Sequence, residues 1–397
     1  MLSRLGLSRS VVGLLAAQIA SQMGDAAFAV LLLWATLHLS SSKVVLGAVA
    51  ALSYLPVLLF GLVGGLAADR LPRRGVMIAS DATRAGVCLS LPLLAAAGVL
   101  SPWALAAGGF ALFAASAFFN PARDAAVPSL VPVEALLAAN AVLQASVPLG
   151  WLLGPAFCSL LLRWADPVTL FAGVGALFVV SVGFLTTLPR LPAVRQGSMV
   201  SGEVFGGLRI VGRDVRLRWL VIITAVDNLL IMGPAVVGTP ILVREVLRGG
   251  ASDYALIEAM YAVGALVGLP LAARLNRAFG QGKVLIAGIF LDGISYLPLF
   301  WVDTVTGVAV TIAVHSLAIP MITVTRTTLI QRITPLPDLG KVFALISMAV
   351  VGLTAISAGV TGVLASQVPV RLIFGAVAVL ASLCGPVALL SREFREA

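Results

Sequence analysis

The sequence contains few charged residues for its length. Of its 397 residues, 11% are charged, 7% are aromatic and 60% are hydrophobic. A soluble domain carries about a quarter charged residues, so this chain has too few to form a water-facing surface. The mean hydropathy is +1.08. These values exclude a soluble globular enzyme, a disordered chain and a disulfide-rich secreted domain.

Cysteine and histidine are also scarce, and so are the motifs of chemical catalysis. Cys88, Cys158 and Cys384 lie in apolar runs without a CxxC pair, which predicts neither a structural disulfide nor a zinc site. The chain contains no HExxH motif and no phosphate-binding Gly-Lys loop. We therefore expect a protein that is not an enzyme and binds no metal or cofactor, with its energy drawn from a proton gradient.

Long apolar runs fill most of the sequence. A membrane-spanning helix needs about 20 such residues, and the alternation typical of membrane β-barrels is missing. The expected helices are 11–37, 44–67, 76–98, 103–122, 135–162, 167–188, 218–243, 255–274, 283–302, 305–325, 341–366 and 370–390. The sequence thus predicts an all-α integral membrane protein with twelve transmembrane helices in two pseudo-symmetric six-helix bundles. The bundles are residues 1–188 and 218–397, joined by a linker, 189–217, with an interfacial helix.

The net charge of +9 has a topological explanation. With twelve spans both termini lie on one side, and most Lys and Arg residues fall in loops on that side. The positive-inside rule then places both termini and the linker in the cytoplasm. We expect a multi-pass protein of the inner (plasma) membrane that does not bind nucleic acid.

The two halves repeat particular residues at nearly constant spacing. Asp25 and Asp227 lie in the first helix of each half, while Arg123 and Arg326 are expected in the loops between helices 4 and 5 and between helices 10 and 11. Such a repeat indicates two halves related by an axis along the membrane normal, as in alternating-access carriers.

The loop between helices 2 and 3 carries a specific pattern, Gly65-Leu-Ala-Ala-Asp69-Arg70-Leu-Pro-Arg73-Arg74. It resembles the signature loop of the major facilitator superfamily. An acid among three arginines at a helix end is expected to act as a conformational latch. The alternative is a basic loop that only sets topology.

Helix 5 contains Gly150-Trp-Leu-Leu-Gly154-Pro155. This stretch resembles the antiporter motif of drug-exporting members of that superfamily, which implies a hinge at these three residues. Gly-x-x-x-Gly also permits close helix contact, so ordinary packing is an equally acceptable reading.

Two further segments resemble a particular branch. Gln22-Met23-Gly24-Asp25 in helix 1 and the block from Asn120 to Ala141 are similar to bacterial siderophore exporters and macrolide-efflux proteins. The bacterial lysophospholipid transporter has a related Gly-Asp and a similar block. The resemblance implies a transporter of small molecules or lipids.

Ionisable residues inside membrane helices are candidate functional groups. We expect Asp25 to couple protons or contact cargo in a cavity, because its helix offers no basic partner on the same face. Asp227 occupies the matching position, and the two acids face each other if both helices line the cavity.

Further cavity candidates are Gln22, Glu258 and the i, i+3 pair Asp81 and Arg84, which is expected to be structural. Asp292 is a weaker candidate that can touch the aqueous rim. His315 can shuttle protons, although a buried, hydrogen-bonded histidine is the commoner case.

The sequence favours a secondary active transporter, a proton-coupled exporter of amphipathic or apolar small molecules. The alternative is a lysophospholipid carrier without obligatory proton coupling. Its expected partners are a small-molecule or lipid substrate and the bilayer, and we expect a monomer.

Overall fold

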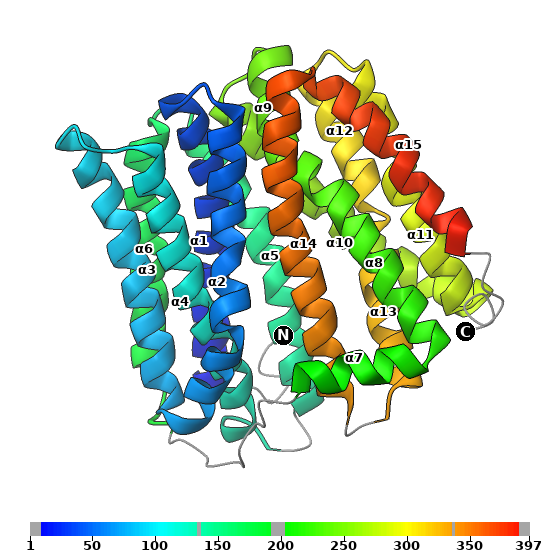
Figure 1. The fold of residues 1–397 in the computed structure, drawn as a ribbon. Helices are drawn as coiled ribbons and strands as arrows, with labels where there is room; N and C mark the ends of the chain where they lie inside the picture. Colours follow the sequence, from blue (N-terminus) through cyan, green and yellow to red (C-terminus); the bar gives the residue numbers. More distant parts are fainter. Residues whose placement is uncertain (1–8, 133–135, 192–202, 336–337, 389–397) are drawn as a thin grey trace. The chain divides into compact units, whose positions relative to one another are not determined.

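A computed structural model describes residues 9–132, 136–191, 203–335 and 338–388. Contacts divide the chain into two compact units. Unit 1 comprises Met1–Ser41 and Leu52–Ser198, and unit 2 comprises Ser42–Ala51 and Met199–Ala397. The described residues form helices and no strands (Figure 1).

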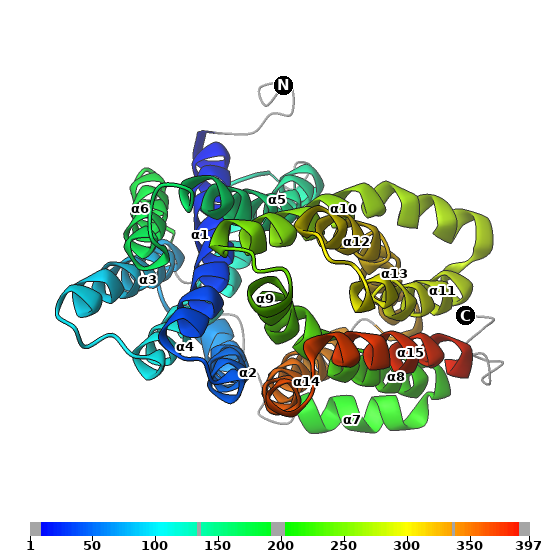
Figure 2. The ribbon, with the colours of Figure 1, turned by 90° about the horizontal axis from the view of Figure 1, so that it is seen from above.

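Unit 1 is built from long helices with short connections. Its helices are α1 (Arg9–Leu39), α2 (Lys43–Arg70, whose first turns belong to unit 2), α3 (Arg73–Ala96), α4 (Pro102–Ala126), the 3-10 turn η2 (Val127–Ser129), α5 (Leu136–Leu161) and α6 (Pro167–Thr186). α1 packs between α5 and α6, and α3 packs against α4 and α6 (Figure 2). Because lipid offers no hydrogen bonds, the helix satisfies its own backbone groups along each span.

Unit 2 repeats these pairings. It contains α7 (Glu203–Arg213), α8 (Val215–Gly233), η4 (Pro234–Gly238), α9 (Thr239–Ile241), η5 (Leu242–Val246), α10 (Ala251–Phe279), α11 (Gln281–Ile294), η6 (Leu297–Phe300), α12 (Val305–Ser316), α13 (Ile319–Ile333), α14 (Leu339–Gln367) and α15 (Val370–Ala388). α8 packs on α14 as α1 packs on α5, and α11 packs on α15 as α3 packs on α6 (Figure 2).

The predicted all-helical membrane fold is confirmed. Eleven helical segments in the described ranges are long and apolar enough to cross a membrane. α5 adds a shorter apolar stretch, Ser146–Leu161, within its 26 residues. Four of the segments consist of more than one helical piece: Pro102–Ser129, Val215–Val246, Gln281–Phe300 and Val305–Ile333.

Several observed helix ends differ from the predicted ones, and two of the differences move an arginine from a loop into a helix. α4 continues to Ala126 and α13 to Ile333, so Arg123 and Arg326 lie within helices rather than in the loops. The apolar pattern stops near both arginines, but no proline follows until Pro128 and Pro335. A helix needs only its backbone hydrogen bonds to continue, and those persist past the apolar stretch.

Side-chain caps fix several helix starts outside the membrane. Asp214 accepts hydrogen bonds from the backbone N–H groups of Arg216 and Leu217 at the start of α8. The Arg216 side chain, also hydrogen-bonded to it, holds the pKa of Asp214 below its usual value. This carboxylate is therefore ionised and acts as a cap at neutral pH.

Candidate functional site

Three charged side chains meet inside unit 1. Arg84 on α3 donates to both carboxylate oxygens of Asp25 on α1, at 2.9 and 3.0 Å. Its second terminal nitrogen lies 2.8 Å from Asp81 Oδ1, one helical turn away. The Arg84 side chain is completely buried. The triad carries two negative charges and one positive charge in its ionised form.

Hydroxyl groups and phenyl rings complete the surroundings of this charge triad. Asp25 accepts from Ser116 Oγ at 3.1 Å, and Asp81 accepts from Ser21 Oγ at 3.2 Å and from Ser181 Oγ at 2.5 Å. The guanidinium carbon lies 4.7 Å from the ring centre of Phe119 and 5.1 Å from that of Phe178. Every oxygen of both carboxylates thus has a donor, as a stable buried ion cluster requires.

The predicted Asp81–Arg84 pair is confirmed, whereas the expectation that Asp25 lacks a basic partner was wrong. The prediction considered only the face of its own helix, and the partner comes from α3. Gln22, one turn before Asp25, is buried as expected of a residue inside the bundle. The role of these residues in transport stays a prediction.

A second buried polar group lies in unit 2 and was not predicted as a pair. His315 Nε2 on α12 lies 3.5 Å from Asp292 Oδ1 on α11. His315 Nδ1 lies 2.9 Å from Ser295 Oγ and 3.2 Å from the Asp292 carbonyl oxygen. The Tyr296 ring covers the imidazole at a centroid distance of 4.3 Å. Asp292 and His315 are 2% and 1% exposed, so neither touches an aqueous rim.

Two further acids of unit 2 were predicted as cavity residues. Asp227 on α8 is buried and interacts electrostatically with both Asp292 and Arg326. Glu258 on α10 is partly buried and accepts a hydrogen bond from Tyr254. Asp227 and Glu258, predicted separately as cavity residues, thus belong to one polar cluster within unit 2. The signal that sequence reasoning missed is the similar depth of Asp292 and His315 in their helices.

The segment predicted as a loop is mostly helical, since Arg70 ends α2 and Arg73 and Arg74 begin α3. The two arginines of α3 tie unit 1 together. Arg73 donates to Ser129 Oγ at 3.2 Å, and Arg74 donates to the Thr186 carbonyl oxygen at 2.7 Å. Arg70 is exposed. The side chains of Gly65 and Asp69 lie outside the described part of the chain. The latch function of this loop stays a prediction.

The glycines of α5 allow close contact with α1. A Cβ atom on Gly154 would lie 2.9 Å from both Ala26 Cβ and the Ala27 nitrogen. A Cβ atom on Gly150 would lie 2.9 Å from the Gln22 carbonyl carbon. The predicted close packing is confirmed. The predicted hinge, with Pro155 inside α5, is a separate expectation that the packing does not test.

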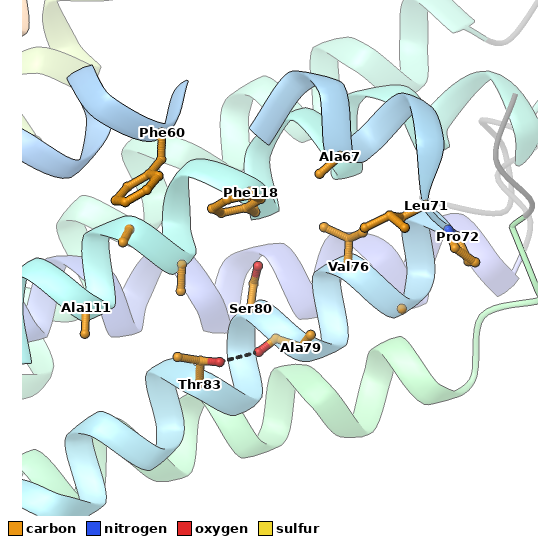
Figure 3. A pocket seen from close by; sticks show the side chains of 13 residues that line it. Phe60, Ala67, Leu71, Pro72, Val76, Ala79, Ser80, Thr83, Ala111 and Phe118 are labelled. Carbon is orange, nitrogen blue, oxygen red and sulfur yellow. Dashed lines mark hydrogen bonds between the residues drawn. The ribbon is translucent and has the colours of Figure 1, made fainter. Parts of the chain in front are cut away.

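A cavity of about 530 Å³ opens between α2, α3 and α4 (Figure 3). Most of its lining is alkyl or phenyl, with hydroxyl groups only from Ser80 and Thr83. The Thr83 hydroxyl already donates to the Ala79 carbonyl oxygen at 2.9 Å. The lining residues are Phe60, Ala67, Leu71, Pro72, Gly75, Val76, Ala79, Ser80, Thr83, Ala111, Ala114, Ala115 and Phe118.

In the described ranges, no group of three or more His, Cys, Asp or Glu side chains is placed to hold a metal ion.

Comparison with known proteins identifies the family. The profile described as transmembrane secretion effector matches residues 7–396. Macrolide efflux protein A of Streptococcus pyogenes is 24% identical over 77% of each chain. The lysophospholipid transporter LplT of Yersinia pestis (strain Pestoides F) is 30% identical over 72% of this chain and 69% of its own. The solved nucleoside transporter NupG covers 96% of this chain and 100% of its own, with a TM-score of 0.77 and 13% identity. That likeness concerns the fold.

Proposed function

This chain belongs to the transmembrane secretion effector family of the major facilitator superfamily, and we propose that it is a proton-coupled exporter of amphipathic or apolar small molecules. It is a multi-pass membrane protein and a transporter of this superfamily. The proposal adds the cargo class, the direction of transport and the energy source.

The observation that carries the cargo class is the lining of the unit 1 cavity. Desolvating a polar cargo costs several kcal/mol unless each of its polar groups is paired. The cavity between α2, α3 and α4 offers two hydroxyls among alkyl and phenyl groups, so it suits an apolar chain or ring. The three buried charges of the triad are engaged with one another, which leaves them unavailable to a sugar or an amino acid.

Proton coupling is supported by buried acids in helices that otherwise carry almost no charge. The efflux protein among the relatives supports the outward direction. The excess of basic residues in loops on the side of the termini supports cytoplasmic termini in an inner membrane. An exporter so placed moves cargo outward while protons enter down their gradient.

The test is transport by the purified chain in proteoliposomes, with a macrolide and a lysophospholipid as separate cargoes. Each cargo is measured with and without an imposed pH gradient. The proposal expects macrolide flux that rises when the compartment receiving the cargo is acidified. Macrolide flux that is the same with and without the gradient contradicts proton coupling. The absence of macrolide flux contradicts the cargo class.

A second candidate is a carrier of lysophospholipid that needs no proton gradient. It is favoured by the relative of that name and by the exposed Arg70, which follows cavity residue Ala67 by three positions and can meet a phosphate. Lysophospholipid movement of equal rate with and without a pH gradient, together with absent macrolide flux, makes this the better function.

A further inference from the structure

Unit 2 contains two buried carboxylate oxygens without a hydrogen-bond partner among the described residues, Asp227 Oδ1 and Asp292 Oδ1. Asp292 Oδ1 is buried and receives no hydrogen bond from any described residue. Leaving a buried acceptor unsatisfied costs about 1–3 kcal/mol, and more for a charged group. His315 Nε2 lies 3.5 Å from Asp292 Oδ1. The chemical state of that nitrogen therefore decides how the site behaves.

We assign the tautomer of neutral His315 from the contacts of the opposite ring nitrogen. Ser295 Oγ donates to the Asp292 carbonyl oxygen at 3.1 Å, so its hydrogen is already used. His315 Nδ1 lies between that hydroxyl oxygen and the same carbonyl oxygen. A carbonyl oxygen only accepts, so the hydrogen-bond network assigns the imidazole proton to Nδ1. Nε2 then presents a lone pair to Asp292 Oδ1.

Two facing lone pairs repel when the carboxylate is ionised, and one proton removes the repulsion. A proton taken up from water forms one new bond to Oδ1 or Nε2, and the other atom accepts its hydrogen bond. Release breaks that bond and returns the proton to water. Uptake of the proton changes the net charge of the pair from −1 to zero.

The site lies near the middle of its spans. His315 is ten residues into Val305–Ile333, about 15 Å along the helix, and Asp292 is at a similar depth after Gln281. The hydrocarbon core is about 30 Å thick. The titratable groups that interact with the pair are Asp227 on α8, Tyr261 on α10 and Tyr296 in the turn after α11. Glu258 on α10 interacts with Tyr296, and Arg326 on α13 and Cys384 on α15 interact with Asp227.

The charge triad of unit 1 differs in exactly this property. All four carboxylate oxygens of Asp25 and Asp81 accept hydrogen bonds from Arg84 or from serine hydroxyls. A proton on any of them displaces an existing donor.

We propose that Asp292 and His315 form the proton-binding site of this transporter, in place of the predicted Asp25. The proposal rests on the proposed proton coupling and names the residues that perform it. Asp227 acts on Asp292 through its charge, while Tyr296 and Ser295 hold the imidazole in place.

Proton binding itself is measured on the purified full-length chain by infrared difference spectroscopy between acidic and alkaline pH. The wild type should show the carbonyl band of a protonated carboxylic acid, and Asp292→Asn should lose it. The matched control is Asp303→Asn, which removes an acid of unit 2 that is 76% exposed and paired with Arg371. A band that survives in Asp292→Asn, or disappears in Asp25→Asn, overturns the assignment.

Transport by the same variants separates this inference from the proposed function. Asp292→Asn should lose the stimulation of cargo flux by a pH gradient but retain exchange of cargo at equal concentrations. Gradient stimulation that persists in this variant overturns the site while leaving proton coupling intact. If a pH gradient does not stimulate cargo flux in the wild type but the infrared band still depends on Asp292, proton coupling is refuted and the proton-binding site is not. If Asp292→Asn does not fold, His315→Gln must shift the midpoint of the band, and an unchanged midpoint refutes the pair.

Discussion

Removing Arg84 should destabilise the chain more than any single change to an exposed charge. Arg84→Met leaves Asp25 and Asp81, both buried, facing each other without a counter-charge. Breaking a buried pair by deleting one partner costs about 3–5 kcal/mol, mainly through the uncompensated charge that remains. The loss of the two ring contacts to Phe119 and Phe178 acts in the same direction.

The same reasoning predicts rescue. In the triple variant Arg84→Met, Asp25→Asn, Asp81→Asn no buried charge is left unpaired, so most of the lost stability should return. Asp25→Asn alone should cost less than Arg84→Met, because Arg84 keeps Asp81 as its partner. A suitable exposed control is Arg216→Met, whose side chain is 42% exposed in its pair with Asp214. Such a pair contributes about 0–1 kcal/mol.

The assay is equilibrium unfolding of the full-length chain in mixed micelles, followed by circular dichroism. The free energy of unfolding is compared between the wild type, Arg84→Met, the triple variant and Arg216→Met. The reasoning is refuted if Arg84→Met is no less stable than Arg216→Met. It is also refuted if the triple variant is as unstable as Arg84→Met, since uncompensated charge would not then be the cause.

Three further predictions concern packing, capping and the loop between α2 and α3. Gly154→Ala should lower the free energy of unfolding by about 1–3 kcal/mol, because the added Cβ meets the α1 backbone. The control is Gly183→Ala, whose added Cβ meets nothing within 4 Å and should leave the stability unchanged. Equal unfolding free energies of the two variants would contradict the contact. Asp214→Ala should cost about 1 kcal/mol of unfolding free energy at pH 7. Since the pKa of Asp214 is lowered in the folded state, its contribution to stability is present above about pH 4 and is lost as the pH falls through the folded pKa. If Asp214→Ala still lowers the unfolding free energy in acid, the ionised cap is not the cause. Asp69→Asn should shift the conformational equilibrium by about 1–3 kcal/mol. The shift is measured as a change in the distances between spin labels attached at Leu71→Cys and Phe279→Cys. Unchanged distances would contradict the latch function.

Local spacing predicted one half of the unit 1 cluster and missed the other. Asp81 and Arg84 lie one turn apart on α3, so the i, i+3 rule finds them. Asp25 joins them from α1, and no pattern within a single helix reports a partner on another helix. The fold was more predictable than the site, because each membrane span corresponds to a continuous apolar run in the sequence.

The pair in unit 2 shows the same limit. Asp292 and His315 belong to different helices, and their contact depends on how α11 and α12 pack. Both residues lie about ten positions after the starts of their helices, and this similar depth in the membrane would have suggested the contact. The predicted loop positions of Arg123 and Arg326 were wrong for another reason. Apolar content indicates the extent of the membrane core and not the end of a helix.

The central claim is that cargo and protons move in opposite directions in one coupled cycle. Proteoliposomes that contain the purified chain and a pH-sensitive dye, with no initial pH gradient, test it directly. The account predicts that a cargo gradient directed out of the vesicles acidifies their interior, and that Asp292→Asn abolishes the acidification while cargo exchange continues. Downhill cargo movement by the wild type with a constant internal pH would contradict the account.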